Sequence, residues 1–365
     1  MNKEPLIHIT KRTELSTGRA WLIRGIAIIA AMLFCGLITL ALTGLNPIKV
    51  YATIFEGSFG SSRRFWVLLS NMSALLGLSL AVTPAFKMRF WNIGAEGQCM
   101  VGCLATAACM ILLGGKLPNG VLWIVMFISA VLAGALWGCI PAFFKAKFGT
   151  NETLFTLMMN YVATQLAAYF IVVWENPKGS ANIGIINQMT NDGWLPVIGG
   201  QKYMLNVIVI VLLTVFMYIY LNYTKHGYEI AVVGESERTA RYIGIKVDRV
   251  ILRTMLLSGA VCGICGWLLV GCTNHTLTKT ITNSYGFTAV MVSWLSRFNP
   301  LIMIFSSFLL IFMNKGASEI ASSFSLNESY GDILTGFLLF FLIGCEFFIN
   351  YKVRFRNKEN KEVKA

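Results

Sequence analysis

The stretch RFWNIGAEGQCMVGC, residues 89–103, places a carboxylate, an amide and several glycines inside a run that otherwise reads as membrane-spanning. A charge in the bilayer core is costly and usually faces the protein interior or a water-filled path. Glycines can interrupt a helix, and transporters place solute sites at broken helices, where freed backbone groups line a cavity. Asn92, Glu96 and Gln98 are therefore predicted either to bind a polar solute or to brace a helix break.

The composition of the whole chain agrees with a membrane location. Of its 365 residues, 56% are apolar and only 13% are charged, whereas about a quarter of the residues of a soluble domain are charged. Apolar runs near the length of a membrane-crossing helix predict spans at 26–45, 65–86, 90–113, 121–144, 153–173, 204–222, 251–272, 286–297, 300–314 and 331–350. The sequence thus predicts an all-α, polytopic transmembrane bundle of about 8–10 spans. The short segments 286–297 and 300–314 are either partial spans or a re-entrant pair.

The net charge of +13 reflects orientation in the membrane and not nucleic-acid binding. Most of the 30 Lys and Arg residues fall in segments that lie on one side if the N-terminus is cytoplasmic. Basic residues concentrate on the cytoplasmic side of membrane proteins, so both termini are predicted to be cytoplasmic. The expected organisation is a cytoplasmic N-terminal segment 1–24, a transmembrane domain 25–350 and a basic cytoplasmic tail 351–365.

Two connecting segments have helical signals of their own. Residues 46–64 combine Pro47 at a first helical turn with apolar residues at helical spacing, which predicts an amphipathic helix on the outer membrane interface. In the cytoplasmic loop 223–250, Ser236 can cap a short helix and Gly244 can end it. This helix is too short and too charged to cross the membrane. It is either a docking surface for a partner or part of a solvated loop.

Two further groups of polar or aromatic residues lie in or beside the predicted spans. Asn151 and Glu152 stand at the start of a span, where Thr150 or Asn151 can cap the helix and Glu152 favours its dipole. Asn160 lies deeper, on a polar stripe that suggests a path or another helix. Phe287 and Trp294 are two helical turns apart and can either stack on a flat ring or pack in the core.

Several motifs of catalysis are absent from the sequence. It has no phosphate-binding G-x-x-x-x-G-K-[ST] loop, no H-E-x-x-H zinc motif, no nucleophile elbow and no acidic metal cluster. Its nine cysteines lie in or beside apolar spans, and the C-x-x-C of Cys262 and Cys265 has no second pair, so packing is the expected role. The sequence therefore predicts neither an enzyme, nor a metal site, nor a cofactor.

Four ordered motifs, FWNIGAEGQ, GTNETLFTLMMNYVA, GYEIAVVGESERTARYIGI and YGFTAVMVSWLSRFNP, occur between about residues 46 and 348. In these the chain resembles the membrane permease subunits of bacterial ABC importers for nucleosides and simple sugars, of the branched-chain amino acid/ribose-type permease family. NIGAEGQ resembles the nucleoside branch, which works with basic-membrane-lipoprotein-type binding proteins. Trp91 and the run SERTA depart from the usual pattern, which affects the substrate and the fit to the ATPase.

The resemblance implies a permease in the bacterial plasma membrane that forms half of a nucleoside path. Its implied partners are a cytoplasmic ABC ATPase, a second permease subunit, an extracytoplasmic binding lipoprotein and membrane lipid. Residues 227–245 would be the coupling segment. The expected path residues are Asn92, Glu96, Gln98, Asn151, Glu152, Asn160, Phe287 and Trp294. The expected ATPase-coupling residues are Gly227, Gly234, Glu235, Arg238, Arg241, Tyr242 and Gly244.

Two other functions fit parts of the same sequence. A self-sufficient secondary transporter would use Glu96, Glu152 or Glu346 as a proton carrier. An ABC permease for a simple sugar such as ribose or galactose would share the four motifs. The segment 227–245 separates the first alternative from the ABC reading, because a docking helix is needed only where a separate motor exists.

Overall fold

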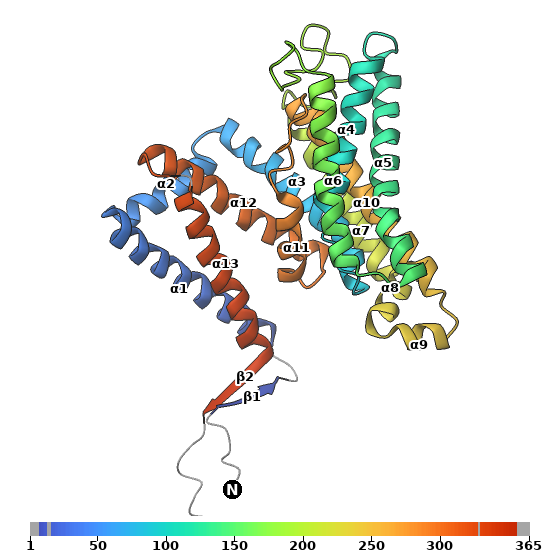
Figure 1. Ribbon diagram of the computed structural model, residues 1–365. Helices are drawn as coiled ribbons and strands as arrows, with labels where there is room; N and C mark the ends of the chain where they lie inside the picture. The colour runs from blue at the N-terminus through green and yellow to red at the C-terminus, as the bar shows by residue number, and fades with distance from the viewer. Residues whose placement is uncertain (1–6, 13–15, 328, 356–365) are drawn as a thin grey trace, which may run out of the picture. The chain divides into compact units, whose positions relative to one another are not determined.

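The computed structural model describes residues 7–12, 16–327 and 329–355, and this part of the chain is almost entirely helical (Figure 1). The helices are α1 (Thr17–Thr43), α2 (Pro47–Phe59), α3 (Ser62–Lys87), α4 (Ala95–Leu113), α5 (Asn119–Phe148), α6 (Glu152–Val173), α7 (Met204–Tyr223), α8 (Lys225–Glu235), α9 (Glu237–Tyr242), α10 (Val247–Leu268), the π-helix η1 (Leu269–Asn274), α11 (Tyr285–Leu295), α12 (Pro300–Ser323) and α13 (Ser329–Asn350). The strands are β1 (Ile7–Lys11) and β2 (Tyr351–Phe355).

Among the described residues, eight helices are long and apolar enough to cross a membrane: α1, α3, α4, α5, α6, α7, α10 with η1, and α12. The 22-residue α13 is also predominantly apolar. The predicted polytopic helical bundle is confirmed. Most of the predicted tail and part of the predicted N-terminal segment lie outside the described residues, and the division into three segments stays a prediction.

The prediction of a short segment at 300–314 is wrong, because α12 continues to Ser323 and has 24 residues. The charged residues Lys315 and Glu319 follow the predicted end of the segment. In the structure Glu319 forms an ion pair with Arg64 at 2.8 Å, so the polar side chain is accommodated without ending the helix. By contrast, α11 has only 11 residues and is shorter than the roughly 20 that a full crossing needs.

The chain divides into two compact units, one formed by residues 1–64 and 312–365 and the other by residues 65–311. In the first unit α1 packs against α13, and β1 pairs antiparallel with β2, with His8 opposite Arg354 (Figure 1). The sequence analysis did not anticipate this ribbon. It holds the start of α1 and the end of α13 at the same side, in agreement with the prediction that both termini share one side of the membrane.

The predicted outer helix at 46–64 forms as α2, in the first unit. The Asn46 side chain accepts a hydrogen bond from the Ile48 N–H at 2.9 Å, and Pro47 occupies the first turn. Its buried face is formed by Val50 and Ile54. The apolar residues that the sequence predicted to face the membrane interface include Ile48, which is exposed within this chain.

In the second unit, α10 packs against α4 and α5 through backbones in close approach. A Cβ atom added at Gly134 would strike the Gly259 carbonyl oxygen, and one added at Gly263 would strike that of Ala130. Small residues allow such approaches between helices in lipid. Cys262 and Cys265 of the C-x-x-C are free and buried in this region, as expected for packing residues.

The long loop 174–202 is tied to the end of α10 and η1. The Trp194 ring stacks on His275 with centroids 3.9 Å apart, and the Leu195 N–H donates to the Gly271 carbonyl at 2.9 Å. Burial, together with the positive charge of Lys202, lowers the pKa of His275 to about 4. The imidazole is therefore neutral at physiological pH.

Candidate functional site

The sequence motif NIGAEGQ lies where the chain breaks between α3 and α4. α3 ends at Lys87 and α4 begins at Ala95, so residues 88–94 form an irregular connection inside the second unit. The break was predicted at the glycines, but only Gly94 belongs to it: Gly94 is the N-cap of α4, and Gly97 is already helical. The first N–H groups of α4 consequently lack helical partners and need acceptors from elsewhere.

Two side chains of α6 hold this region: Asn160 supplies an acceptor to α4, and Thr156 binds the break just before it. Asn160 accepts a hydrogen bond from the Gly97 N–H at 2.8 Å and donates one to the Ile93 carbonyl, also at 2.8 Å. The Thr156 hydroxyl accepts from the Ile93 N–H at 3.2 Å. Both side chains are buried. The predicted polar stripe of α6 thus faces another helix start and fixes the break in one conformation.

Asn92 completes this brace from within the break. Its Oδ1 atom accepts hydrogen bonds from the Gly94 N–H at 2.9 Å and from Gln98 Nε2 at 3.3 Å, and its amide donates to Ser258 Oγ at 3.0 Å. Asn92 and Gln98 are buried, and Gln98 Oε1 has no hydrogen-bond partner in the described part of the chain. For Asn92, the contacts favour bracing over solute binding.

Glu96 connects α4 to α11, which lies 190 residues further along the chain. Its Oε2 atom accepts a hydrogen bond from the Gly286 N–H at 2.7 Å, and its Oε1 atom accepts one from the Thr282 hydroxyl. Gly286 is in the first turn of α11, where a negative charge is favoured by the helix dipole. Glu96 therefore acts as a side-chain cap for α11, and its buried carboxyl group is paired with two donors.

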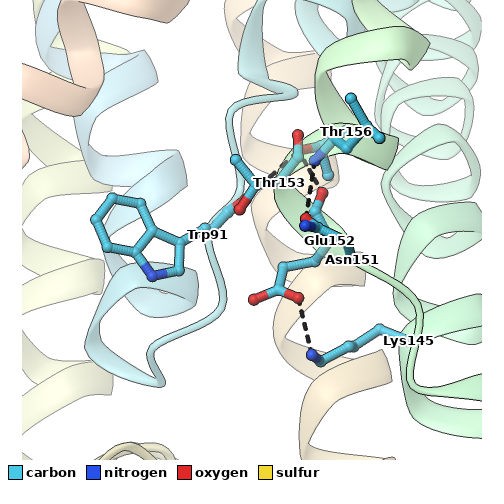
Figure 2. A network of polar contacts seen from close by, with 7 residues as sticks. Trp91, Lys145, Asn151, Glu152, Thr153 and Thr156 are labelled. Atoms are coloured by element: carbon cyan, nitrogen blue, oxygen red, sulfur yellow. Dashed lines mark hydrogen bonds and ion pairs between the residues drawn. The ribbon is translucent and has the colours of Figure 1, made fainter.

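At the start of α6, Asn151 and Glu152 extend the same network of polar contacts (Figure 2). Asn151 caps the helix by accepting from the Leu154 N–H at 3.1 Å, as predicted. Glu152 forms an ion pair with Lys145 at the end of α5, at 2.8 Å. Figure 2 shows this pair below Thr156, whose hydroxyl lies 2.8 Å from the Glu152 carbonyl oxygen.

The structure separates the two aromatic residues that the sequence grouped. Trp294, near the end of α11, stacks on Trp91 of the break with centroids 5.5 Å apart and planes 28° apart. Phe86 and Phe298 flank this pair edge-on. Trp91 and Trp294 remain 44% and 48% exposed, so part of each ring is open to a partner or solute. Phe287 is also partly exposed but does not belong to this aromatic group.

The predicted coupling segment, residues 227–245, contains parts of two helices instead of one. The Thr224 hydroxyl accepts from the Gly227 N–H at 3.2 Å and starts α8, which the sequence analysis missed. The Ser236 side chain accepts from the Thr239 N–H at 3.2 Å and starts α9, and Gly244 has a φ of 87° just beyond it. The predicted cap and stop are confirmed.

The two glycines of α8 are contact points with neighbouring helices. A Cβ atom at Gly227 would lie 2.5 Å from the Leu221 carbonyl oxygen of α7, and one at Gly234 would strike the Lys87 carbonyl oxygen at the end of α3. Glu229 also pairs with Arg253 of α10 at 2.9 Å. Therefore α8 packs against the ends of three helices, α3, α7 and α10. The end of α3 leads directly into the break.

The charged and aromatic coupling residues have a different setting, because they face outward. Glu235, Arg238, Arg241 and Tyr242 are all exposed, and Tyr242 is 92% exposed. Only Arg241 has a charged neighbour among them, Asp248 at 3.3 Å.

The described residues contain no group of three or more His, Cys, Asp or Glu side chains that could hold a metal ion.

The model of the permease component of branched-chain amino acid transport systems matches residues 63–343, most of the chain and all of the site. The chain belongs to this family. It is 28% identical to the glucose ABC transporter permease protein TsgB13 of Haloferax volcanii, over 92% of this chain and 90% of that protein. It is also 27% identical to the guanosine ABC transporter permease protein NupP of Bacillus subtilis, over 88% of this chain and 92% of that protein.

A third relative is the nucleoside ABC transporter permease protein NupB of Lactococcus lactis, with 25% identity over 87% of this chain and 89% of that protein. Family membership and the apolar helices together make this chain a multi-pass permease of the plasma membrane. It is a transport subunit, and the family resemblance expected from the four motifs is confirmed.

Sequence reasoning missed three partners in this permease's network: Ser258, Thr282 and the Gly286 N–H. Thr282 lies just before the YGFTAVMVSWLSRFNP motif and Gly286 lies within it, but nothing in their local pattern points to Glu96. The stack between Trp91 and Trp294 was missed for the same reason, although Trp91 was already noted as a departure from the family pattern. These contacts join segments about 200 residues apart.

Proposed function

We propose that this permease forms half of a translocation path for nucleosides, and that a separate ABC ATPase drives its alternating access through α8 and α9. The main support for the proposal is the close packing of α8 against the end of α3, where the break begins. A helix in that position transmits force from a cytoplasmic motor, because its backbone touches Lys87 immediately before the irregular segment.

The contacts give this transmission a physical route. Movement of α8 displaces the Lys87 carbonyl, residues 88–94 follow, and Glu96 carries the displacement to the start of α11 through the Gly286 N–H. A conformational change is driven only by contacts that differ between its two states. The hydrogen bonds of Glu96 and Asn160 are the contacts that we expect to differ.

The proposed ATPase contact is the exposed surface of α9, formed by Arg238, Arg241 and Tyr242. The guanidinium groups of Arg238 and Arg241 suit acidic residues on the ATPase. A second permease subunit, a different chain, would supply the other half of the path, and an extracytoplasmic lipoprotein would deliver the solute. The relatives named as ABC transporter permeases support this assembly.

For the solute, we propose a purine or pyrimidine nucleoside. NupP and NupB are named for guanosine and nucleosides, and the exposed faces of Trp91 and Trp294 offer a stacking surface for a flat base. Phe287, on the same helix as Trp294, would line the path further along. In this proposal Asn92, Gln98, Asn151, Glu152 and Asn160 shape the path by holding the break.

Uptake by the complete complex tests this substrate proposal. Proteoliposomes with the permease pair, the ATPase and the binding protein would be given labelled guanosine and competed with unlabelled uridine, adenine, glucose and ribose. Competition by nucleosides and not by sugars is expected. Competition by glucose or ribose alone would support the sugar alternative, which the similarity to TsgB13 favours.

The proton-coupled alternative has less support from the contacts. Glu96 is held by two donors at the start of α11, and Glu152 is paired with Lys145. A carrier carboxylate must release and rebind a proton freely, which these partners oppose. Glu346, the third candidate, has a side chain outside the described set.

A further inference from the structure

An apolar groove lies between α1 and α13 in the first unit. It has a volume of about 430 Å³ and is walled by Ile23 and Ile26 of α1 and by Phe340, Phe341 and Phe348 of α13. Ala27 and Cys345 also line the groove, and both pack against Ile349. The groove belongs to helices that lie within the membrane-spanning part of the chain.

We propose that this groove binds one acyl chain of an anionic phospholipid from the leaflet beside the β1–β2 ribbon. The length of the groove supports a single leaflet as the source. From Phe340 to Phe348 the helix rises about 12 Å, at 1.5 Å per residue. One leaflet contributes about 15 Å of hydrocarbon, half of the bilayer core.

The floor of the groove is open because of a glycine. A Cβ atom added at Gly344 would meet no atom within 4 Å, although its neighbours on the same helix face, Phe341 and Phe348, are large rings. A side chain at this position would occupy the space that we assign to the acyl chain. Gly344 is thus the residue that keeps the groove accessible.

Two exposed cationic side chains stand at one end of the groove. Arg19 precedes Ile23 by four residues, which places it one turn away on the same face of α1. Lys352 follows Phe348 by four residues and lies in β2, opposite Thr10 of β1. Both side chains are exposed. Because α1 starts where α13 ends, both charges lie at the same end.

Charge at that end selects the headgroup. The termini are predicted to be cytoplasmic, and the cytoplasmic leaflet carries the anionic lipids that attract Lys and Arg near the surface. A phosphodiester headgroup at the level of Arg19 and Lys352 would leave its acyl chain beside Ile23 and Phe348. This binding site is independent of the proposed solute, and rests on the membrane location and on the cytoplasmic side of the termini.

Lipid retention by the purified full-length chain tests the proposal. The chain would be exchanged into micelles with equal amounts of phosphatidylglycerol and phosphatidylcholine of identical acyl chains. The lipid that remains bound would then be counted by native mass spectrometry. Wild-type protein is expected to retain phosphatidylglycerol several-fold more than phosphatidylcholine. Gly344→Trp, which fills the groove, is expected to lose the bound lipid.

The helix α13 provides its own control. Gly336 also has no atom within 4 Å of an added Cβ, but it does not line the groove, so Gly336→Trp should retain lipid as the wild type does. The double variant Arg19→Gln with Lys352→Gln leaves the groove intact. It should bind both lipids equally, which keeps the test decisive if the Trp variant does not fold.

Three results would overturn the proposal. The first is equal phosphatidylglycerol retention by the wild type and a folded Gly344→Trp variant. The second is an unchanged lipid preference in the Arg19→Gln, Lys352→Gln variant. The third is a wild-type dimer that binds no lipid and that Gly344→Trp converts to a monomer, because a second copy of the chain would then occupy the groove.

Discussion

Replacing Glu96 with Gln removes one charge from the contact between α4 and α11 with little change in shape. The carboxylate accepts from the Gly286 N–H and from the Thr282 hydroxyl. A Gln side chain has one oxygen, so it can satisfy only one of these donors in the same way. Hydrogen bonds to charged groups contribute about 1.5–3 kcal/mol, and a charge at a helix N-terminus contributes up to about 2 kcal/mol. The expected cost is therefore about 2–4 kcal/mol.

The assay combines uptake with stability. Since about 1.4 kcal/mol corresponds to a tenfold change in an equilibrium constant, Glu96→Gln should reduce ATP-driven uptake at least tenfold and lower the midpoint of thermal unfolding of the purified complex. Asp at this position keeps the charge but shortens the reach, so it should recover part of the uptake at most.

A matched control exists in the outer loop. Glu175 also accepts from two donors, the N–H groups of Gly179 at 2.7 Å and Ala181 at 2.9 Å, and these hydrogen bonds lower the pKa of its carboxyl group. It is remote in sequence from the break and partly exposed. Glu175→Gln should leave uptake unchanged. Wild-type uptake and stability in Glu96→Gln would refute the assignment of the carboxylate as the link between α4 and α11.

Three further variants test other parts of the account. Gly234→Val places a branched side chain against the end of α3, so ATP hydrolysis should continue while uptake falls, and coupled uptake in this variant would count against the α8 route. Replacing Arg238 and Arg241 with Glu should reduce co-purification of the ATPase without affecting membrane insertion. If both co-purification and uptake stay at wild-type levels, the loop is only a spacer. His275 has its pKa lowered to about 4 by burial and by Lys202, whereas an unfolded His has a pKa of about 6.5. Its contribution to stability is present above about pH 6.5 and is lost as the pH falls toward 4, so His275→Phe should flatten the decline of the unfolding midpoint over that interval.

Local signals in the sequence predicted the helix ends correctly. Asn151 and Ser236 each cap a helix through a hydrogen bond to an N–H group three residues further along. Gly244 ends a helix because glycine readily adopts a positive φ. The span positions followed from apolar runs in the same way. One exception has a physical cause: α12 tolerates Glu319 because of its ion pair with Arg64, and that pairing is not visible in a local pattern.

Contacts between distant segments could not be predicted from the sequence. Glu96 was identified as an unusual charge, but its role depends on Thr282 and Gly286, which the fold brings to it. The helix α8 was missed because Gly227 and Gly234 resemble helix breakers. In the structure they are the positions at which a backbone approaches too closely for any larger side chain.

The energy source of uptake distinguishes an ABC importer from a proton-coupled transporter. Proteoliposomes would contain either this chain alone or the complete complex with the ATPase, the second permease and the binding protein, and each would be tested with ATP and with a proton gradient. The account predicts that only the complete complex accumulates nucleoside and that only ATP drives it. Accumulation by this chain alone on a proton gradient, unaffected by ATP, would contradict the account.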